Sequence, residues 1–207
     1  MRSSKRKLVL GISSLALASP VFAQLGGLGG VLGGGSKSGG GDPKKIEADL
    51  RSIIEKTSIA LSKLAEAMGL KESAAKMQQT ADDIKSGKVG ISDSTNVVSD
   101  VSASVKAEME KNQKEGKKLD SKSSSTAVQA LEPGIQSFPL WKSVIDGGKS
   151  LDKTALLSLP DLAQAIPKVP TAAKNSLEMY QAGISYLTFS GADTSSLKKS
   201  AESALKF

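Results

Sequence analysis

Residues 42–69 read DPKKIEADLRSIIEKTSIALSKLAEAMG, and this stretch decides the fold class. Its apolar residues recur at spacings of three and four, which places them on one face of an α-helix. These residues are Ile46, Leu50, Ile53, Ile54, Leu61, Leu64, Ala65 and Met68. Asp42-Pro43 is typical of a helix start, because a carboxylate caps the first turn and proline at the first position loses no hydrogen bond. With Gly69 as a stop, the stretch predicts one long amphipathic helix.

The helical pattern continues after Gly69. Apolar residues around Met77 and Ile84 predict a shorter helix at about residues 72–86, which Gly87 would end. A second stripe contains Val97, Val98, Val101, Val105 and Met109. We expect Ser92-Asp93 to cap the helix that carries this stripe.

Beyond residue 126 the helical segments are shorter and more often interrupted. Residues 127–145 are apolar but broken by Pro133-Gly134 and Pro139, and Gly147-Gly148 is expected to end that segment. Short segments follow between prolines 160, 167 and 170. A continuous stripe from Val169 to Leu187 then predicts a strong helix that Gly191 stops, and Asp193 would cap a last one.

No stretch alternates polar and strand-forming residues, so the predicted fold class is all-α. We expect an antiparallel helical bundle of roughly five to seven helices over residues 42–207. Residues 120–126 (DSKSSST) lack periodicity and are predicted to be a linker or a weak helix junction. They would separate two possible subregions, 42–119 and 127–207.

The N-terminus has the three zones of a secretory signal peptide. Basic residues in positions 2–7 precede an apolar run from Leu8 to Ala18, and the small residues Val21 and Ala23 follow at the positions that signal peptidase requires. We therefore expect cleavage between Ala23 and Gln24. The apolar run is roughly half the 20 residues of a membrane-spanning helix, and no later stretch is apolar enough to span a bilayer.

Residues 24–41 form a Gly-rich leader that contains Leu25, Leu28, Val31 and Leu32. Glycine at this density disfavours both helix and strand, because each glycine loses backbone entropy on ordering. We interpret the leader as a flexible spacer. The alternative interpretation, a segment that docks on a partner or a membrane surface, would depend on these four aliphatic side chains, which bury little area.

Composition excludes several classes of protein. The chain contains no cysteine and no histidine, which excludes disulfides, structural zinc, Ser–His–Asp or Cys–His catalysis and ordinary haem ligation. We expect no cofactor and no metal. Four of the 28 basic residues and none of the 21 acidic ones lie in residues 1–23, so the rest of the chain carries a net charge of only +3. With 3% aromatic residues, nucleic-acid binding is not expected.

Three patterns resemble catalytic or nucleotide-binding motifs without completing them. Residues 147–150 (GGKS) resemble the end of a phosphate-binding loop, but Ser143 occupies the position of its first glycine. Ser-x-x-Lys occurs repeatedly, as at Ser73, Ser195, Ser196 and Ser203, without the companion motifs of the serine enzymes that use it. The closest carboxylate pairs are Asp82-Asp83 and Glu108/Glu110, and both lie in charged segments that we expect to be exposed.

Four aromatic residues form the candidate ligand or partner groove. These are Phe138, Trp141, Tyr180 and Tyr186. Core packing is the more ordinary role for such residues, but the same side chains would line a groove for an apolar ligand or a partner helix.

The sequence favours an exported, non-enzymatic helical binding or scaffold protein of the bacterial cell envelope, periplasmic or secreted. Its partner would be another envelope protein or an apolar ligand. A carrier of lipid or another apolar small ligand is the first alternative. A hydrolase that uses carboxylate or Ser/Lys chemistry is the second.

Overall fold

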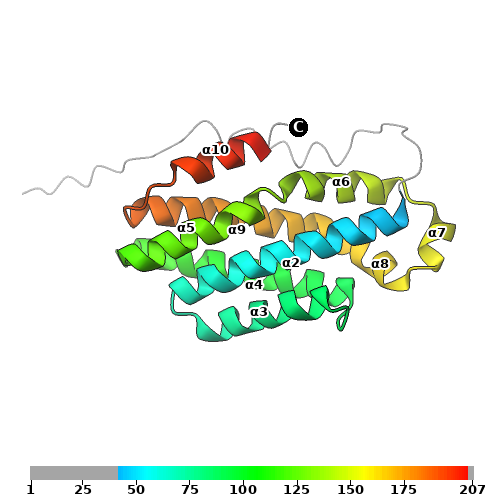
Figure 1. Ribbon diagram of the computed structural model, residues 1–207, viewed down its shortest axis with the longest axis horizontal. Helices are drawn as coiled ribbons and strands as arrows, with labels where there is room; N and C mark the ends of the chain where they lie inside the picture. The colour runs from blue at the N-terminus through cyan, green and yellow to red at the C-terminus, as the bar shows by residue number, and fades with distance from the viewer. Residues whose placement is uncertain (1–41, 205–207) are drawn as a thin grey trace, which may run out of the picture. The chain divides into compact units, whose positions relative to one another are not determined.

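The computed structural model describes residues 42–204, in which every regular element is a helix (Figure 1). In chain order these are α2 (Pro43–Ala67), α3 (Lys71–Lys85), α4 (Ile91–Lys114), α5 (Ser121–Ile135), α6 (Phe138–Lys149), α7 (Lys153–Leu157), α8 (Pro160–Ala165), the 3₁₀ turn η2 (Ile166–Lys168), α9 (Val169–Phe189) and α10 (Ser195–Ala204). The all-α prediction is confirmed for these residues. The predicted signal peptide (1–23) and Gly-rich leader (24–41) lie outside the described residues.

Helix α2 is the central element, and it begins and ends as predicted. The Asp42 carboxylate accepts a hydrogen bond from the Lys44 backbone N–H at 3.0 Å, and Gly69 adopts the left-handed conformation after the last turn (φ 76°). The predicted apolar face is buried, with Leu50, Ile53 and Leu61 fully inaccessible to solvent. Because this face is broad, α2 packs against α3, α4, α5 and α6.

Successive passes of the chain along the unit alternate in direction (Figure 1). Helices α5 and α6 lie end to end and together return the chain along the length of α2 (Figure 1). Contacts between α2 and α5, and between α4 and α9, join the two predicted subregions. Residues 42–119 and 127–204 therefore share one core.

Helices α4 and α9 differ from the expected antiparallel arrangement, because they are packed side by side and run parallel. We call the three side-chain contacts that join α4 to α9 and to Lys168 of the preceding turn η2 the polar seam. These contacts join Lys168 Nζ to Ser92 Oγ at 2.6 Å, Asn175 Nδ2 to Ser99 Oγ at 2.8 Å, and Lys106 Nζ to Glu178 Oε2 at 2.6 Å. The residue numbers rise together on both helices, and the α4 members are seven residues apart, which is the repeat of one face of a helix.

Two predicted helix boundaries are wrong because capping groups determine them where apolar periodicity is absent. Residues 120–126 are not a linker, since α5 begins at Ser121 with the Asp120 carboxylate accepting hydrogen bonds from the Ser123 N–H (2.8 Å) and Oγ (2.9 Å). Ser92-Asp93 does not cap α4, which begins at Ile91 after Gly90. The cap comes from Asp161, whose carboxylate accepts from the backbone N–H groups of Ile91 at 2.6 Å and Ser92 at 3.1 Å.

The predicted breaks at Pro133-Gly134 and Gly147-Gly148 are also wrong, since the glycines serve close packing inside helices. Helix α5 continues through Pro133-Gly134, and α6 continues through Gly147-Gly148 to Lys149. A Cβ atom added at Gly147 would lie 2.8 Å from Ile46 Cδ1, and one at Gly148 would lie 3.0 Å from Ile166 Cδ1. The absence of a side chain thus lets α2 and η2 approach α6 closely.

Candidate functional site

The four aromatic residues of the predicted groove are all buried, with exposed fractions of 6% for Phe138, 3% for Trp141, 1% for Tyr180 and 2% for Tyr186. Phe138 at the start of α6 and Tyr180 on α9 meet edge to face, with ring centroids 5.4 Å apart and an interplanar angle of 84°. Tyr186 lies farther along α9 and stacks on Phe189 at 6.4 Å. The structure therefore brings two of the four residues together and places them in the packed interior.

The Tyr180 hydroxyl is the most confined polar group of this interior. It points at the backbone of Gly134, where an added Cβ atom would lie only 1.7 Å from the hydroxyl oxygen. Burial raises the pKa of Tyr180 well above its usual value, and the Thr57 hydroxyl opposes that rise. This tyrosine is a neutral packing residue and lacks the ionisation that acid–base chemistry near neutral pH needs.

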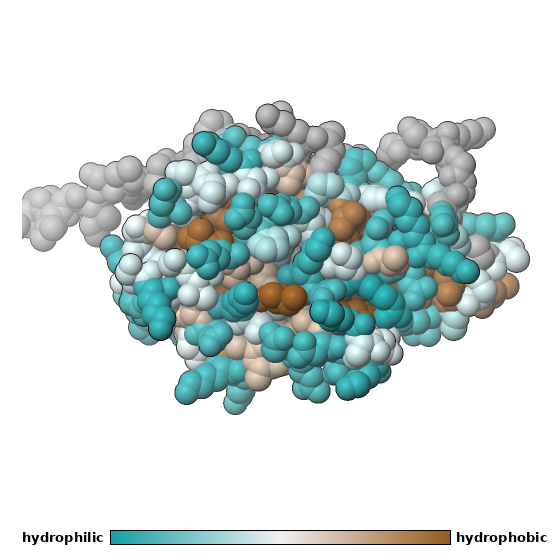
Figure 2. All heavy atoms as spheres, viewed as in Figure 1, coloured by the Kyte–Doolittle hydropathy of each residue, from teal (hydrophilic) through white to brown (hydrophobic). Residues whose placement is uncertain are grey.

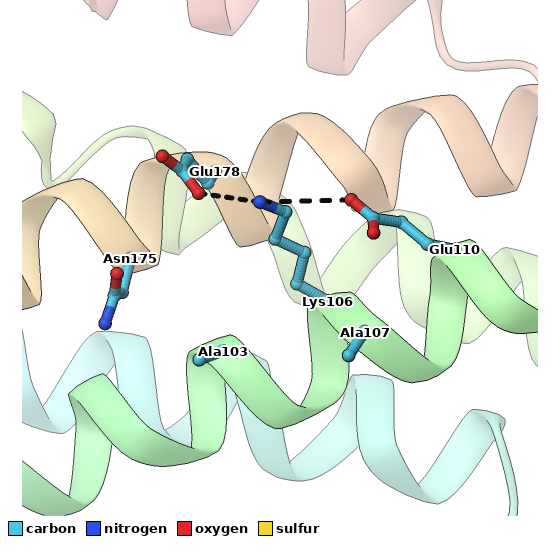
Figure 3. A pocket seen from close by; sticks show the side chains of 6 residues that line it. All are labelled: Ala103, Lys106, Ala107, Glu110, Asn175 and Glu178. Carbon is cyan, nitrogen blue, oxygen red and sulfur yellow. Dashed lines mark hydrogen bonds and ion pairs between the residues drawn. The ribbon is translucent and has the colours of Figure 1, made fainter.

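A shallow hollow of about 170 Å³ lies on the outer side of α4 and α9, and Figure 3 shows its lining. Ala103 and Ala107 border it on α4, and Lys106 lies between two carboxylates. The Lys106 ammonium is 2.6 Å from Glu178 on α9 and 3.9 Å from Glu110 on its own helix. Contact with Glu178 raises the pKa of Lys106 and lowers the pKa of Glu178. Both carboxylates of this hollow are already paired with Lys106, and Lys174 also lies 3.8 Å from Glu178, so the evident role of the Lys106–Glu178 contact is to hold α4 against α9.

A larger hollow of about 440 Å³ lies where several helices end, and we call it the end hollow. It is lined by the α2–α3 turn (Ala67, Met68, Gly69), by Glu108 and Asn112 of α4, by Lys117, Lys118, Leu119 and Asp120 between α4 and α5, and by Tyr186 of α9. Burial raises the pKa of Tyr186, and a hydrogen bond with the Asn112 side chain opposes this rise. Tyr186 is the predicted site residue that borders the end hollow, and half of the lining residues there are charged or carry an amide.

The end hollow could not be singled out from the sequence pattern. Lys117 and Lys118 fall in a polar stretch without periodicity, and such stretches are usually solvated. Asn112 is nine-tenths buried near the end of α4, where it follows the apolar residues Val105 and Met109 on the inner face. A polar residue at an inward helical position is the signal that could have indicated a polar site at this end of the helix.

The motifs that resemble catalytic ones lie in ordinary helical surroundings. Gly147 and Gly148 are inside α6, so residues 147–150 form no phosphate-binding loop. Asp82 and Asp83 are on α3, where Asp82 is exposed, and Glu108 pairs with Lys111 at 3.3 Å. Within residues 42–204, no three acidic side chains come together in a way that could hold a metal ion. None of the described helices is both long and apolar enough to cross a bilayer.

The visible surface is predominantly hydrophilic. On the face drawn in Figure 2, hydrophobic residues occur as separate spots among hydrophilic ones. Of the large apolar side chains in the described part of the chain, only Leu157 on α7 is strongly exposed, at 82%. Polar contacts are therefore the main recognition chemistry that this surface offers.

No family model, curated protein or solved structure matches this chain.

The Lys106–Glu178 pair predicts a small, pH-dependent contribution to stability. Glu178→Gln should lower the free energy of unfolding by roughly 0.5 kcal/mol at neutral pH, because both side chains are about one-third exposed. The lowered pKa of Glu178 means that the contribution is present above the ordinary glutamate pKa and is lost as pH falls through the folded-state value. The raised pKa of Lys106 means that it is present below the ordinary lysine pKa and is lost as pH rises through the folded-state value. Urea unfolding at neutral and acidic pH measures this.

Glu110→Gln is the matched control for Glu178→Gln. Glu110 lies 3.9 Å from the same ammonium and on the same helix as Lys106, so its removal should cost less. An effect of Glu178→Gln that persists unchanged in acid, or that equals the effect of Glu110→Gln, would contradict the assignment of the pair.

Proposed function

We propose that the chain is an exported, non-enzymatic helical binding or scaffold protein of the bacterial cell envelope. The observation that carries this proposal is the contrast between the interior and the surface of the described unit. The aromatic side chains that could have lined an apolar site are packed inside, whereas the end hollow presents ammonium, carboxylate and amide groups. This contrast favours recognition of a polar partner at the surface over uptake of an apolar ligand.

The predicted signal peptide supports the export part of the proposal, and the polar seam supports the scaffold part. A scaffold needs helices that keep their relative positions, and the three side-chain contacts of the polar seam resist sliding of α4 against α9 and η2. The helical cap that Asp161 provides to α4 adds a fourth point of attachment.

Native mass spectrometry of the protein isolated gently from the envelope fraction of its own host tests the binding proposal. We expect the mass of residues 24–207, alone or with a protein or small polar partner. A lipid that remains bound, and that exchanges with a fluorescent fatty acid, would overturn the proposal in favour of a carrier. A catalytic activity that a single substitution abolishes would overturn it in favour of an enzyme.

The export part predicts a defined processing site. N-terminal sequencing of the envelope form should begin at Gln24, and Ala23→Phe should leave most of the chain at its full mass of 21.4 kDa, because signal peptidase requires a small residue before the cut. Phe22→Leu is the control, since that position carries no such requirement. Export without cleavage, or equal processing of both variants, would contradict the assigned site.

A further inference from the structure

We propose that the end hollow binds a small zwitterion of amino-acid chemistry, either a free amino acid or the carboxylate end of a short peptide. The carboxylate would be held by Lys117 and Lys118, and the adjacent N–H groups by backbone carbonyls of the α2–α3 turn. This proposal deepens the proposed function, since it names what the surface recognises. It rests only on the binding part of that function and is independent of export.

The two lysines are positioned at the hollow and keep hydrogen-bonding capacity. Glu115 lies 2.6 Å from the Lys117 ammonium, and Lys118 lies over the Phe189 ring with its ammonium 5.2 Å from the ring centroid. These contacts restrain both side chains beside the hollow. An ammonium group has three N–H donors, so each lysine can donate to a ligand carboxylate while it keeps its present contact.

Acceptors come from the turn that ends α2. This turn uses the carbonyls of Leu64, Ala65 and Glu66 to receive the backbone N–H groups of the following residues. The next two carbonyls, those of Ala67 and Met68, belong to residues that line the hollow. The Ala67 and Met68 carbonyls come directly after the three that accept hydrogen bonds within the turn. Carbonyl groups at the C-terminal end of a helix favour N–H donors as partners, and a ligand could supply these donors.

The remaining lining fits a dipolar ligand better than a simple anion. Glu108 and Asp120 balance the two lysines, and both carboxylates already have partners, Lys111 at 3.3 Å and the Ser123 N–H at 2.8 Å. Asn112 is nine-tenths buried and has both donor and acceptor atoms in its side-chain amide. A volume of about 440 Å³ lies within the range of small-molecule sites and admits a dipeptide.

Proton–nitrogen NMR titration of the purified full chain tests the proposal with four probes: alanine, Ala-Ala, N-acetyl-Ala-Ala and Ala-Ala amide. We expect Ala-Ala to shift the signals of Gly69, Leu119 and the Asn112 side-chain amide in a saturable manner. Ala-Ala amide lacks the carboxylate and should leave them unchanged. Alanine binding as tightly as Ala-Ala would assign the hollow to free amino acids, and tighter binding of Ala-Ala would assign it to peptide ends. N-acetyl-Ala-Ala is an anion without an ammonium group, so its binding as tightly as Ala-Ala would overturn the assignment to a zwitterion.

The variant Lys117→Gln/Lys118→Gln should weaken binding of Ala-Ala at least tenfold. Lys56→Gln/Lys88→Gln is the matched control, because both of these lysines are exposed and neither lines the hollow. The absence of saturable shifts at millimolar Ala-Ala, equal binding of the amide, or undiminished binding by the first variant would overturn the proposal. Each of these failures would leave the lipid-free mass expected for a binding or scaffold protein untouched, so the two proposals fail separately.

Discussion

Gly134→Ala is expected to lower the free energy of unfolding by about 3 kcal/mol, the upper part of the range for overpacked cores. The new Cβ atom would lie 1.7 Å from the Tyr180 hydroxyl oxygen, 2.4 Å from Cζ and 2.7 Å from Cε1. The tyrosine ring is fully buried and packs edge to face on Phe138, so it has no free space in which to rotate away. Alanine is the better helix former by about 1 kcal/mol, and the collision outweighs that gain. Chemical denaturation measures the change.

A double-mutant cycle with Tyr180→Leu separates the collision from other effects. Leucine is shorter than tyrosine, so Gly134→Ala should cost far less in the Tyr180→Leu background than in the wild type. Gly148→Ala is the matched control, because this glycine is also inside a helix but its Cβ would meet Ile166 less closely, at 3.0 Å from Cδ1 and 3.3 Å from Cγ2. We expect the control to remain within about 1 kcal/mol of wild type. An equal cost of Gly134→Ala in both backgrounds would contradict the proposed contact.

Asp161→Ala is expected to lower the free energy of unfolding by about 2 kcal/mol, the upper value measured for loss of a helix cap. The Asp161 carboxylate accepts hydrogen bonds from the Ile91 and Ser92 N–H groups at the start of α4. Gly90 precedes these two residues and has no side chain that could replace the Asp161 carboxylate as a cap. Ile91 is fully buried, so its N–H would lose its partner with little access to water. Thermal or urea unfolding measures the loss.

Two other substitutions at this cap and one control make the interpretation specific. Asp161→Asn keeps an acceptor oxygen and should cost less than Asp161→Ala. Gly90→Ala would place a Cβ atom 2.8 Å from Asp161 Oδ1 and should displace the same carboxylate, so its effect should not add to that of Asp161→Ala. Asp152→Ala removes the exposed cap of the five-residue α7 and should cost less than about 0.5 kcal/mol. Equal costs for Asp161→Ala and Asp152→Ala would contradict the long-range cap.

Helices with a strong apolar stripe could be predicted from the sequence, because burial of that stripe is what stabilises them. Helix α2 begins at Pro43 as expected, and α9 ends at Phe189, next to the predicted stop at Gly191. The start of α5 could not be predicted in this way, since Ser121 to Thr126 present no stripe and the Asp120 cap is the only local signal. The start of α4 depends on Asp161, which is about 70 residues away in sequence and therefore outside any local pattern.

The glycines at 134, 147 and 148 show why helix breaks were misplaced. A glycine in sequence indicates either a turn or a close approach between elements, and local context does not distinguish the two. Here each of the three glycines faces a side chain from another helix or turn, namely Tyr180, Ile46 or Ile166. The stops that were predicted correctly, at Gly69, Gly87 and Gly191, have positive φ angles and no neighbouring side chain within 4 Å.

Local sequence patterns were also insufficient to predict the candidate site. The aromatic residues were identifiable by type, and their burial follows from their size and apolarity. The end hollow is assembled from the end of α2, the end of α4, the following loop and the end of α9, which meet only in the folded chain. No pattern of residue spacing between positions 67 and 186 could have predicted that these segments converge.

The parallel pairing of α4 and α9 has a consequence for the order in which the chain is made. Each α4 residue of the polar seam has a partner that is 72 to 76 residues farther along the chain. Closing such distant contacts is slow in comparison with an up-and-down bundle of neighbouring helices, because the intervening chain loses entropy before the contact forms. The first half of the chain, although rich in helix, thus leaves one flank of α4 uncovered until synthesis passes residue 178. Under the export that we propose, this delay would lengthen the time for which the chain stays unfolded before it crosses the membrane.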